Sequence, residues 1–281
     1  MTLRRSTASR WALLPVAASR ETVLVATEDF VANLRFDFSD QTVVVSGGTR
    51  GIGRAISEAF LAAGARVIAT YRSNAQAANE WHASLPEEQR QRAQAAQLDA
   101  AAHDDVEVFF RELETNEVVP SVLVNNAGIR RDQPLAMMNP ADWDAVMQAN
   151  LTGTYTMSKF AVQAMMSKRY GRVVNITSVG AHVGFQGQAN YAATKAGQIA
   201  LTRSLSKEVA KRNITVNCVS PGFVETELLS DLEPEQQKEY KGMVPLRRFA
   251  KPEEVAAAVQ FLASREAAYI TGTVLEVAGG L

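Results

Sequence analysis

The sequence has a single cysteine, Cys218, and three histidines among its 281 residues. One cysteine cannot form a disulfide within the chain, and the histidines and cysteine lack zinc-type spacing, so neither a disulfide framework nor a bound metal is expected. No apolar run has the length needed to cross a bilayer. The 29 basic and 30 acidic residues leave a formal charge of −1, which gives no overall attraction to nucleic acid or anionic membranes. A soluble globular protein that acts on small molecules is therefore favoured.

The N-terminal segment differs in composition from the rest of the chain. Its first twenty residues carry four arginines and no acid, around a short apolar stretch. Such a segment is typical of a disordered tail or an upstream start codon, and alternatively of an organelle presequence or a secretion signal. We therefore treat residues 1–35 as an N-terminal extension and residues 36–281 as a single domain.

From Phe36 onward, short β-branched runs alternate with longer helical patterns. Most of the runs are continuously apolar, as is typical of parallel strands buried on both faces. The predicted strands are Thr42–Ser46, Arg66–Thr70, Gln94–Leu98, Ser121–Asn125, Arg172–Thr177, Thr215–Val219 and Thr273–Val277. Between the third and fourth runs, apolar residues recur at helical spacing from Val106 to Leu113 after Asp104, a candidate N-cap. This order predicts an α/β fold, a Rossmann-type doubly wound parallel sheet of about seven strands with helices on both faces.

The first predicted strand ends in a glycine-rich turn that leads into a helical pattern. Gly47, Gly51 and Gly53 have the spacing Gly-x3-Gly-x-Gly. Glycines let the backbone turn tightly and let a pyrophosphate approach the N-terminus of the next helix, where free N–H groups and the helix dipole favour negative charge. Because the spacing differs from Gly-x-Gly-x-x-Gly, a glycine turn without a ligand remains an alternative if this turn is taken alone.

The end of the second predicted strand favours NADP(H) over NAD(H). No Asp or Glu occurs in residues 67–73, where a carboxylate would bind the ribose diol and repel a 2′-phosphate. Arg72, together with Arg50, can pair with that phosphate. The alternative is that both arginines are solvated surface residues. Asp99, after the third predicted strand, can accept a hydrogen bond from an adenine amino group, or it is an ordinary turn residue.

A second signal combines Ser178 with Tyr191 and Lys195. Tyr191 and Lys195 are four residues apart, which on a helix places both side chains on one face. The Lys195 ammonium can then favour the phenolate, lower the pKa of Tyr191 from its reference value of about 10 and make it a usable proton donor. Ser178, at the end of a predicted strand, can hydrogen-bond the same reacting oxygen. Each residue is weak evidence alone, but together with the glycine turn they point to carbonyl chemistry.

Six features in order make the chain from Asp40 to Leu281 resemble the short-chain dehydrogenase/reductase family. They are Gly47-x3-Gly51-Ile52-Gly53, Asn125-Asn126-Ala127-Gly128, Asn150, Ser178, Tyr191-x3-Lys195 and Pro221-Gly222-x3-Thr226. Further stretches, residues 125–132, 187–193, 221–226 and 267–272, are most similar to the 3-oxoacyl-[acyl-carrier-protein] reductases of that family. Ser46 departs from the usual Thr but keeps a hydroxyl group.

The resemblance implies an NADPH-dependent reductase that transfers hydride to the C3 ketone of an acyl thioester on acyl carrier protein, in fatty-acid or polyketide-type chain elongation. Tyr191 would donate the proton, Ser178 would orient and stabilise the oxygen, and Lys195 would also bind the nicotinamide ribose. Asn150 would hold a water that links Lys195 to solvent. The expected cofactor contacts are Gly47, Thr49, Arg50, Gly51, Ile52, Gly53, Arg72, Asp99, Asn125, Ala127, Gly128, Tyr191, Lys195, Pro221, Gly222, Val224 and Thr226.

Residues 223–250 are expected to form a mobile lid over an apolar acyl chain. This segment contains Leu228, Leu229, Met243 and Leu246 among many charged residues. An ordinary surface insertion is the alternative. Family members that act on a carrier protein meet it with basic residues, and the matching positions here are Arg169 and Arg212; solvated helix ends are the alternative for both. The resemblance further implies a cytoplasmic homotetramer.

Two other functions remain open. One is a reductase or dehydrogenase of the same family that acts on another ketone or alcohol, which would reduce free ketones faster than carrier thioesters. The other is a nucleotide-binding regulator without turnover, which would need Lys195 for the ribose but not the proton donor Tyr191. Cys218 is interpreted as a buried strand thiol.

Overall fold

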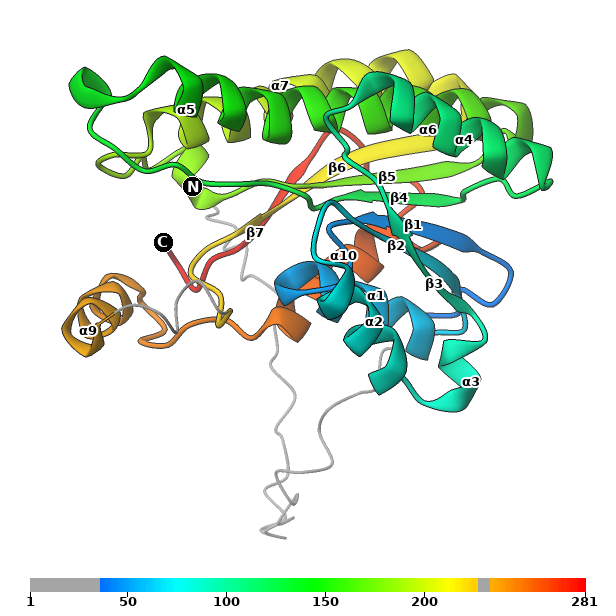
Figure 1. Ribbon diagram of the computed structural model, residues 1–281, viewed down its shortest axis with the longest axis horizontal. Helices are drawn as coiled ribbons and strands as arrows, with labels where there is room; N and C mark the ends of the chain where they lie inside the picture. Colours follow the sequence, from blue (N-terminus) through cyan, green and yellow to red (C-terminus); the bar gives the residue numbers. More distant parts are fainter. Residues whose placement is uncertain (1–35, 227–232) are drawn as a thin grey trace, which may run out of the picture. The chain divides into compact units, whose positions relative to one another are not determined.

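Seven apolar runs of the chain form the strands of one parallel sheet (Figure 1). The computed structural model describes residues 36–226 and 233–281. The strands are β1 (Thr42–Ser46), β2 (Arg66–Tyr71), β3 (Ala93–Gln97), β4 (Val122–Asn125), β5 (Gly171–Ile176), β6 (Ile214–Pro221) and β7 (Val274–Val277). Their order across the sheet is β3-β2-β1-β4-β5-β6-β7. Every predicted strand boundary lies within two residues of the observed one, and the predicted doubly wound fold is confirmed.

Burial along the strands follows their place in the sheet. The central strands β4, β5 and β6 are buried at every residue, because helices cover both faces. β3 forms an edge and consists of alanine and glutamine, and its side chains are only half-buried or exposed. Burial of the strands therefore decreases from the centre of the sheet to its edges, since the edge strand β7 is also only half-buried or exposed.

Helices cover both faces of the sheet (Figure 1). On one face lie α1 (Gly51–Ala62), α2 (Ala75–Ser84), α3 (Glu87–Arg90) and α10 (Pro252–Ala263), and on the other lie α4 (His103–Thr115), α5 (Pro140–Val146), α6 (Gly153–Lys168) and α7 (Ala189–Val209). Shorter turns are η1 (Leu135–Met137), η2 (Met147–Thr152), η3 (Val179–Ala181) and η4 (Ala210–Arg212), and α9 (Pro234–Met243) lies at one side. Two apolar cores result, one on each face of the sheet. No described helix is long and apolar enough to cross a membrane.

Helix α4 begins earlier than its sequence pattern predicts. Ala102, in an extended conformation, is the N-cap, and no side chain caps the helix. The prediction of Asp104 as the cap is wrong, since this residue lies within the first turn, where its carboxylate favours the positive end of the helix dipole instead. Val106 and Phe110 are buried as their spacing predicts.

The sheet changes direction of winding at β1. This strand pairs with β2 on one side and with β4 on the other, so the connections leave its carboxyl end in opposite directions. Ligands bind at such a switch point in doubly wound folds, in the crevice at the carboxyl ends of the strands. The glycine turn follows β1, Ser178 follows β5 and Gly222 follows β6, so the sequence motifs meet at this edge.

Candidate active site

The glycine turn after β1 has a backbone that only glycine tolerates. Gly47 and Gly51 have φ values of +63° and +51°, in the left-handed region. A Cβ atom at Gly53 would lie 2.1 Å from the carbonyl oxygen of Gly47. The side-chain amide of Asn126 donates to the carbonyl oxygens of Ser46, at 3.1 Å, and Gly47, at 3.0 Å. The turn is thus fixed from β4 as well as from its own strand.

The hydroxyl group at Ser46 joins β1 to the segment after β4. Its Oγ accepts hydrogen bonds from the backbone N–H groups of Asn126 and Ala127, at 3.0 and 3.1 Å. A serine can make these bonds as well as the usual threonine can. The departure at this position is therefore mild, as expected.

Helix α7 brings Tyr191 and Lys195 together beside Ser178. The Lys195 Nζ atom lies 5.5 Å from the centre of the Tyr191 ring. The Ser178 hydroxyl lies close enough to the Tyr191 phenol to act on its pKa. Ser178 also caps η3, because its Oγ accepts from the N–H of Gly180 at 3.1 Å. The spacing in the sequence thus correctly predicts the proximity of the three side chains.

The pKa values of the pair differ from the expectation that Lys195 lowers the pKa of Tyr191. Burial raises the pKa of Tyr191 above its ordinary value, although the Ser178 hydrogen bond and the charge of Arg130 act to lower it. That expectation is wrong in direction. Lys195 is itself buried, donates to the carbonyl oxygen of Ile176 at 2.7 Å, and has its pKa lowered by burial to about 8. Desolvation therefore dominates both groups.

Asn150 lies in η2, a π-helical turn, and both polar atoms of its side chain form hydrogen bonds. Its Oδ1 accepts from the N–H of Ile129 at 2.8 Å, and its Nδ2 donates to the Ile129 carbonyl at 3.0 Å and to Thr194 Oγ1 at 3.2 Å. The Asn150 carbonyl accepts from Gln198 Nε2 at 3.0 Å and from Thr154 Oγ1 at 2.7 Å. Any water bound to that carbonyl on a path to Lys195 would share it with these two donors.

The segment after β6 returns to the glycine turn. A Cβ atom at Gly51 would lie 3.7 Å from Thr226 Cγ2, so Thr226 stands beside the start of α1. Gly222 packs closely on Ala278, since a Cβ there would lie 3.0 Å from its Cα atom. Val224 is buried and forms a bridge with Ala250. The expected contacts from Pro221 to Thr226 thus lie at the same edge of the sheet.

The residues expected at the adenosine end lie near the surface. Arg50 and Arg72 are both exposed. Asp99 stabilises the turn that contains it, because its Oδ1 accepts a hydrogen bond from the N–H of Ala101 at 3.0 Å. The alternative of an ordinary turn residue is therefore consistent with the structure. Arg72 and Asp99 both line a hollow of about 740 Å³ between β3 and α4, which is not lined by Tyr191 or Lys195.

Comparison with known proteins agrees with this geometry. A sequence model describing enoyl-(acyl carrier protein) reductases matches residues 47–281. The 3-oxoacyl-[acyl-carrier-protein] reductase FabG of Aquifex aeolicus is 42% identical over 238 residues, which cover 85% of this chain and 96% of that protein. The protein of the same name from Escherichia coli strain K12 is 41% identical over 247 residues, covering 87% and 98%.

The chain belongs to the short-chain dehydrogenase/reductase family. A solved structure from Agrobacterium tumefaciens, provisionally named a gluconate dehydrogenase, superposes with a TM-score of 0.82 at 30% identity and covers 87% of this chain and 96% of that one. The chain is accordingly an NADP-dependent oxidoreductase of this family.

The glycine turn fits the diphosphate of such a cofactor. No side chain caps α1, and its first turn contains no acid that would repel phosphate. The space that Gly53 leaves against Gly47 closes for any larger residue. Beside the proposed ribose position, a Cβ at Gly128 would lie 3.8 Å from Lys195 Nζ. Because these glycines have no side chain, a dinucleotide can approach the backbone closely at these positions.

The two arginines expected to bind a carrier protein lie far from the catalytic end of β5. Arg169 ends α6, two residues before β5, and Arg212 ends η4, two residues before β6. Arg169 Nη2 donates to the carbonyl of Lys211 at 3.3 Å, so the two positions adjoin. Ser178 follows the opposite end of β5, and a strand of 6 residues spans about 20 Å.

An aromatic cluster connects α9 to the loop after Ser178. Phe223 stacks on Tyr240 of α9 with ring centres 4.8 Å apart and lies 5.7 Å from Phe185. Two of the apolar lid residues, Met243 and Leu246, are exposed. Leu228 and Leu229 lie outside the described residues. The contacts place α9 beside the loop that follows Ser178.

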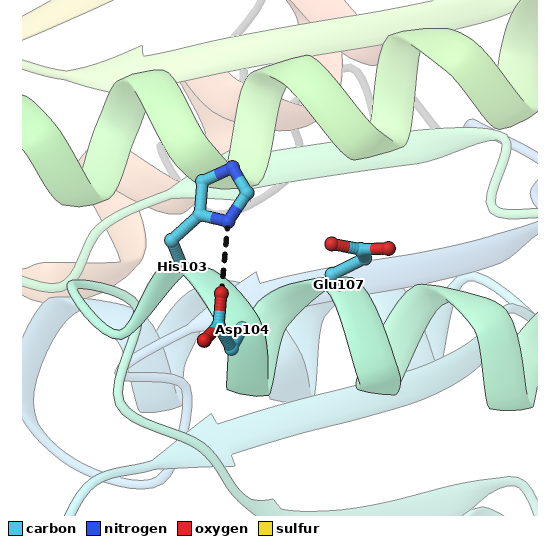
Figure 2. Close-up of side chains that lie close together, drawn as sticks. All are labelled: His103, Asp104 and Glu107. Atoms are coloured by element: carbon cyan, nitrogen blue, oxygen red, sulfur yellow. Dashed lines mark hydrogen bonds and ion pairs between the residues drawn. The ribbon is translucent and has the colours of Figure 1, made fainter.

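His103, Asp104 and Glu107 form a cluster on α4 with the ligand types that bind metals (Figure 2). His103 Nδ1 lies 3.4 Å from Asp104 Oδ1, and the Lys159 ammonium donates to His103 Nε2 at 3.1 Å. A lysine ammonium bound to the imidazole opposes a cation at the same place, and His103 and Asp104 are solvent-exposed. We assign it no function in the chemistry.

The sequence alone indicates no function for Arg130, although it lies within residues 125–132, which resemble the family. The Arg130 guanidinium carbon lies 5.9 Å from the centre of the Tyr191 ring. Gln198, which donates to the Asn150 carbonyl, was also missed. Its position three residues after Lys195 places it on the same face of α7, and this spacing was the available signal. The signal for Arg130 was the pair Arg130-Arg131, which begins two residues after Gly128.

Proposed function

We propose that the protein reduces a 3-oxoacyl thioester on acyl carrier protein to the 3-hydroxyacyl thioester, with NADPH as the reductant. The observation that carries this proposal is the position of Lys195 Nζ, 5.5 Å from the centre of the Tyr191 ring, with the Ser178 hydroxyl beside the same phenol. The identity to named 3-oxoacyl-[acyl-carrier-protein] reductases over most of both chains supports the substrate class.

The chain's own residues supply a proton and hold the reacting oxygen. The bound cofactor supplies the hydride. Tyr191 donates its hydroxyl proton to the oxygen of the C3 carbonyl as negative charge develops there, and Ser178 hydrogen-bonds the same oxygen. Lys195 binds the nicotinamide ribose and places its Nζ atom 5.5 Å from the centre of the Tyr191 ring. Asn150 holds the Ile129 backbone against α7 and gives a site for a water that returns a proton toward Lys195.

The cofactor contacts follow from the glycine turn outward. Gly47, Gly51 and Gly53 receive the diphosphate at the start of α1, with Thr49, Arg50 and Ile52 beside it. Arg72 and Arg50 pair with the 2′-phosphate, and Asp99 with the adenine through its second carboxylate oxygen. The remaining contacts at the strand ends are Asn125, Ala127, Gly128, Pro221, Gly222, Val224 and Thr226.

Substrate binding involves the segment 223–250 as a lid and Arg169 with Arg212 as the site for the acidic carrier. Since these arginines lie at the amino ends of β5 and β6, and β5 itself is fully buried, a carrier bound there presents its acyl chain to the site of a neighbouring copy. We therefore propose a homotetramer, in which a neighbouring copy is present, and a cytoplasmic location. The catalytic domain in this proposal is residues 36–281, and residues 1–35 lie outside the described residues.

The test is oxidation of NADPH, with NADH in parallel, in the presence of a 3-oxoacyl-carrier thioester. We expect turnover with NADPH that falls at least ~100-fold in Tyr191→Phe, because general-acid catalysis of this kind contributes about 10²- to 10⁴-fold. Tight NADPH binding without turnover of this substrate would contradict the proposal. Faster reduction of a free ketone would move the assignment to a reductase of small carbonyl compounds, for which the likeness to a gluconate dehydrogenase is the supporting observation.

A further inference from the structure

Two cations, not one, approach the ring of Tyr191. Lys195 Nζ lies 5.5 Å from the ring centre, and the Arg130 guanidinium carbon lies 5.9 Å from it. Lys195 reaches the ring from the next turn of α7, whereas Arg130 reaches it from the loop after β4. The Lys195 ammonium is directed to the carbonyl oxygen of Ile176. Arg130 is thus a separate source of positive charge at the same ring.

A built set of contacts holds the Arg130 guanidinium in place. Arg130 donates to both carboxylate oxygens of Asp132, with Nε 3.2 Å from Oδ1. Gln188, just before α7, donates from Nε2 to Asp132 Oδ2 at 3.1 Å. The backbone N–H of Gln133 donates to the Gly187 carbonyl at 2.8 Å. The loop that carries Arg130 is therefore attached to the start of the helix that carries Tyr191.

The charges around the phenol favour its ionised form. Three charged groups face Tyr191 or its ring: Lys195 from α7, and Arg130 and Asp132 from the loop after β4. Arg130 acts to lower the pKa of Tyr191 more than Asp132 acts to raise it. Although burial acts to lower the pKa of Arg130, the hydrogen bond and charge of Asp132 raise it, so the guanidinium remains charged. The charge of Tyr240 in α9 also acts to raise the pKa of Arg130.

We propose that Arg130 is a positioning residue for the proton donor, whose fixed positive charge favours release of the Tyr191 proton and offsets part of the cost of burying that hydroxyl. This inference rests on the proposed function of Tyr191. A proton donor works best when its acidity approaches the working pH, and burial alone moves Tyr191 away from that range. Arg130 acts in the opposite direction, and Asp132 with Gln188 keeps it there.

The direct test is an optical titration of Tyr191 in the full-length protein, which needs no turnover. The difference in tyrosinate absorbance between a protein and its Tyr191→Phe counterpart follows this hydroxyl alone. We expect Arg130→Gln to raise the titration midpoint by about one pH unit, since a nearby opposite charge shifts a pKa by roughly 1 to 3 units and Asp132 offsets part of it. Arg130→Lys, which keeps the charge, should restore most of the shift.

Arg131→Gln is the matched control. Its guanidinium lies 3.7 Å from Asp142 and its side chain is 60% exposed, so the same charge is removed one residue away. We expect this variant to keep the midpoint of the wild type. No shift in Arg130→Gln, an equal shift in Arg131→Gln, or a shift that Arg130→Lys does not reduce would each overturn the proposal.

A kinetic readout separates this positioning function from a purely structural one. In Arg130→Gln the alkaline limb of kcat/KM for thioester reduction should move to higher pH in step with the optical midpoint, with an unchanged KM for NADPH. A lower kcat with an unmoved limb would show that Arg130 only holds the loop. If the wild type reduces no carrier thioester, the proposed function fails while the optical result still decides the effect of Arg130.

Discussion

The ammonium nitrogen of Lys195 lies 2.7 Å from the carbonyl oxygen of Ile176, at the end of β5. This bond holds the side chain inside the protein, where burial lowers its pKa from 10.5 to about 8. Near pH 8 the group is therefore balanced between its charged and neutral forms. A lysine in that state can both bind a ribose hydroxyl and exchange protons with the groups around it.

The buried Lys195 should make the unfolding free energy depend on pH. The unfolded chain binds this proton more tightly than the folded protein, so the cost of burial is complete below about pH 8 and is relieved as pH rises toward 10.5. Between pH 8 and 9 we expect wild type to gain ~1 kcal/mol relative to Lys195→Met. Urea unfolding of both proteins at the two pH values measures this gain.

Above about pH 9, Cys218 has the opposite effect and lowers the free energy of unfolding as pH rises. Burial raises its pKa to about 11, so the folded thiol keeps a proton that the unfolded thiol loses from about pH 9 upward. Because Lys195→Met keeps Cys218, the difference between the two proteins isolates the lysine. An equal pH dependence in both would contradict the lowered pKa.

Gly53→Ala should disable the cofactor turn. The added Cβ would lie 2.1 Å from the Gly47 carbonyl oxygen, so the backbone has to shift. The usual preference of a helix for alanine, about 1 kcal/mol, cannot offset that collision. We expect NADPH affinity to fall at least ~10-fold and the melting temperature to drop, measured by fluorescence titration and thermal unfolding. Gly242→Ala is the control, because a Cβ there meets nothing within 4 Å.

Arg72→Gln should weaken NADPH more than NADH. An arginine paired with the 2′-phosphate contributes a charge-assisted bond of about 1.5 to 3 kcal/mol, so we expect KM for NADPH to rise ~10-fold or more while KM for NADH changes little. Arg66→Gln is a matched control, since Arg66 begins β2 and Arg72 directly follows its end. Equal effects of Arg72→Gln on the two cofactors would place Arg72 among the solvated surface arginines.

Removing Arg169 and Arg212 should affect only carrier-bound substrates. In the double variant Arg169→Ala/Arg212→Ala we expect kcat/KM for a carrier thioester to fall ~10-fold at low salt, because opposite charges steer association. The same thioester on a short free thiol provides the control and should react at the wild-type rate, since both arginines lie at the amino ends of their strands. Unchanged efficiency with the carrier would contradict the docking assignment and favour a free ketone substrate.

Local pattern was sufficient for most of the fold. The run Thr42–Ser46 is predicted with the observed bounds, and the other strands shift by one or two residues, because a continuous β-branched run has few alternatives to a buried strand. The cap of α4 was mispredicted, since Asp104 can serve a helix dipole from within the first turn as well as cap it. Only the surrounding chain decides between these positions.

In the candidate site, too, some features follow from the sequence and others only from the fold. The proximity of Tyr191 to Lys195 follows from their spacing on one helix, and the approach of Ser178 from its place at a strand end. The sign of the Tyr191 pKa shift does not follow from spacing, because burial outweighs the neighbouring charges. Asn150 likewise reveals its partners Ile129 and Gln198 only in the folded chain.

Short-range order along the chain thus determined the parallel sheet, the glycine turn and the set of residues at its carboxyl edge, since each depends on periodicity and on contacts between near neighbours. Tertiary packing alone placed Arg130 beside Tyr191 and put Arg169 and Arg212 at the opposite end of β5 from Ser178. It also set the protonation of Lys195, because a pKa depends on how much water the whole fold removes and on which distant charges it brings near.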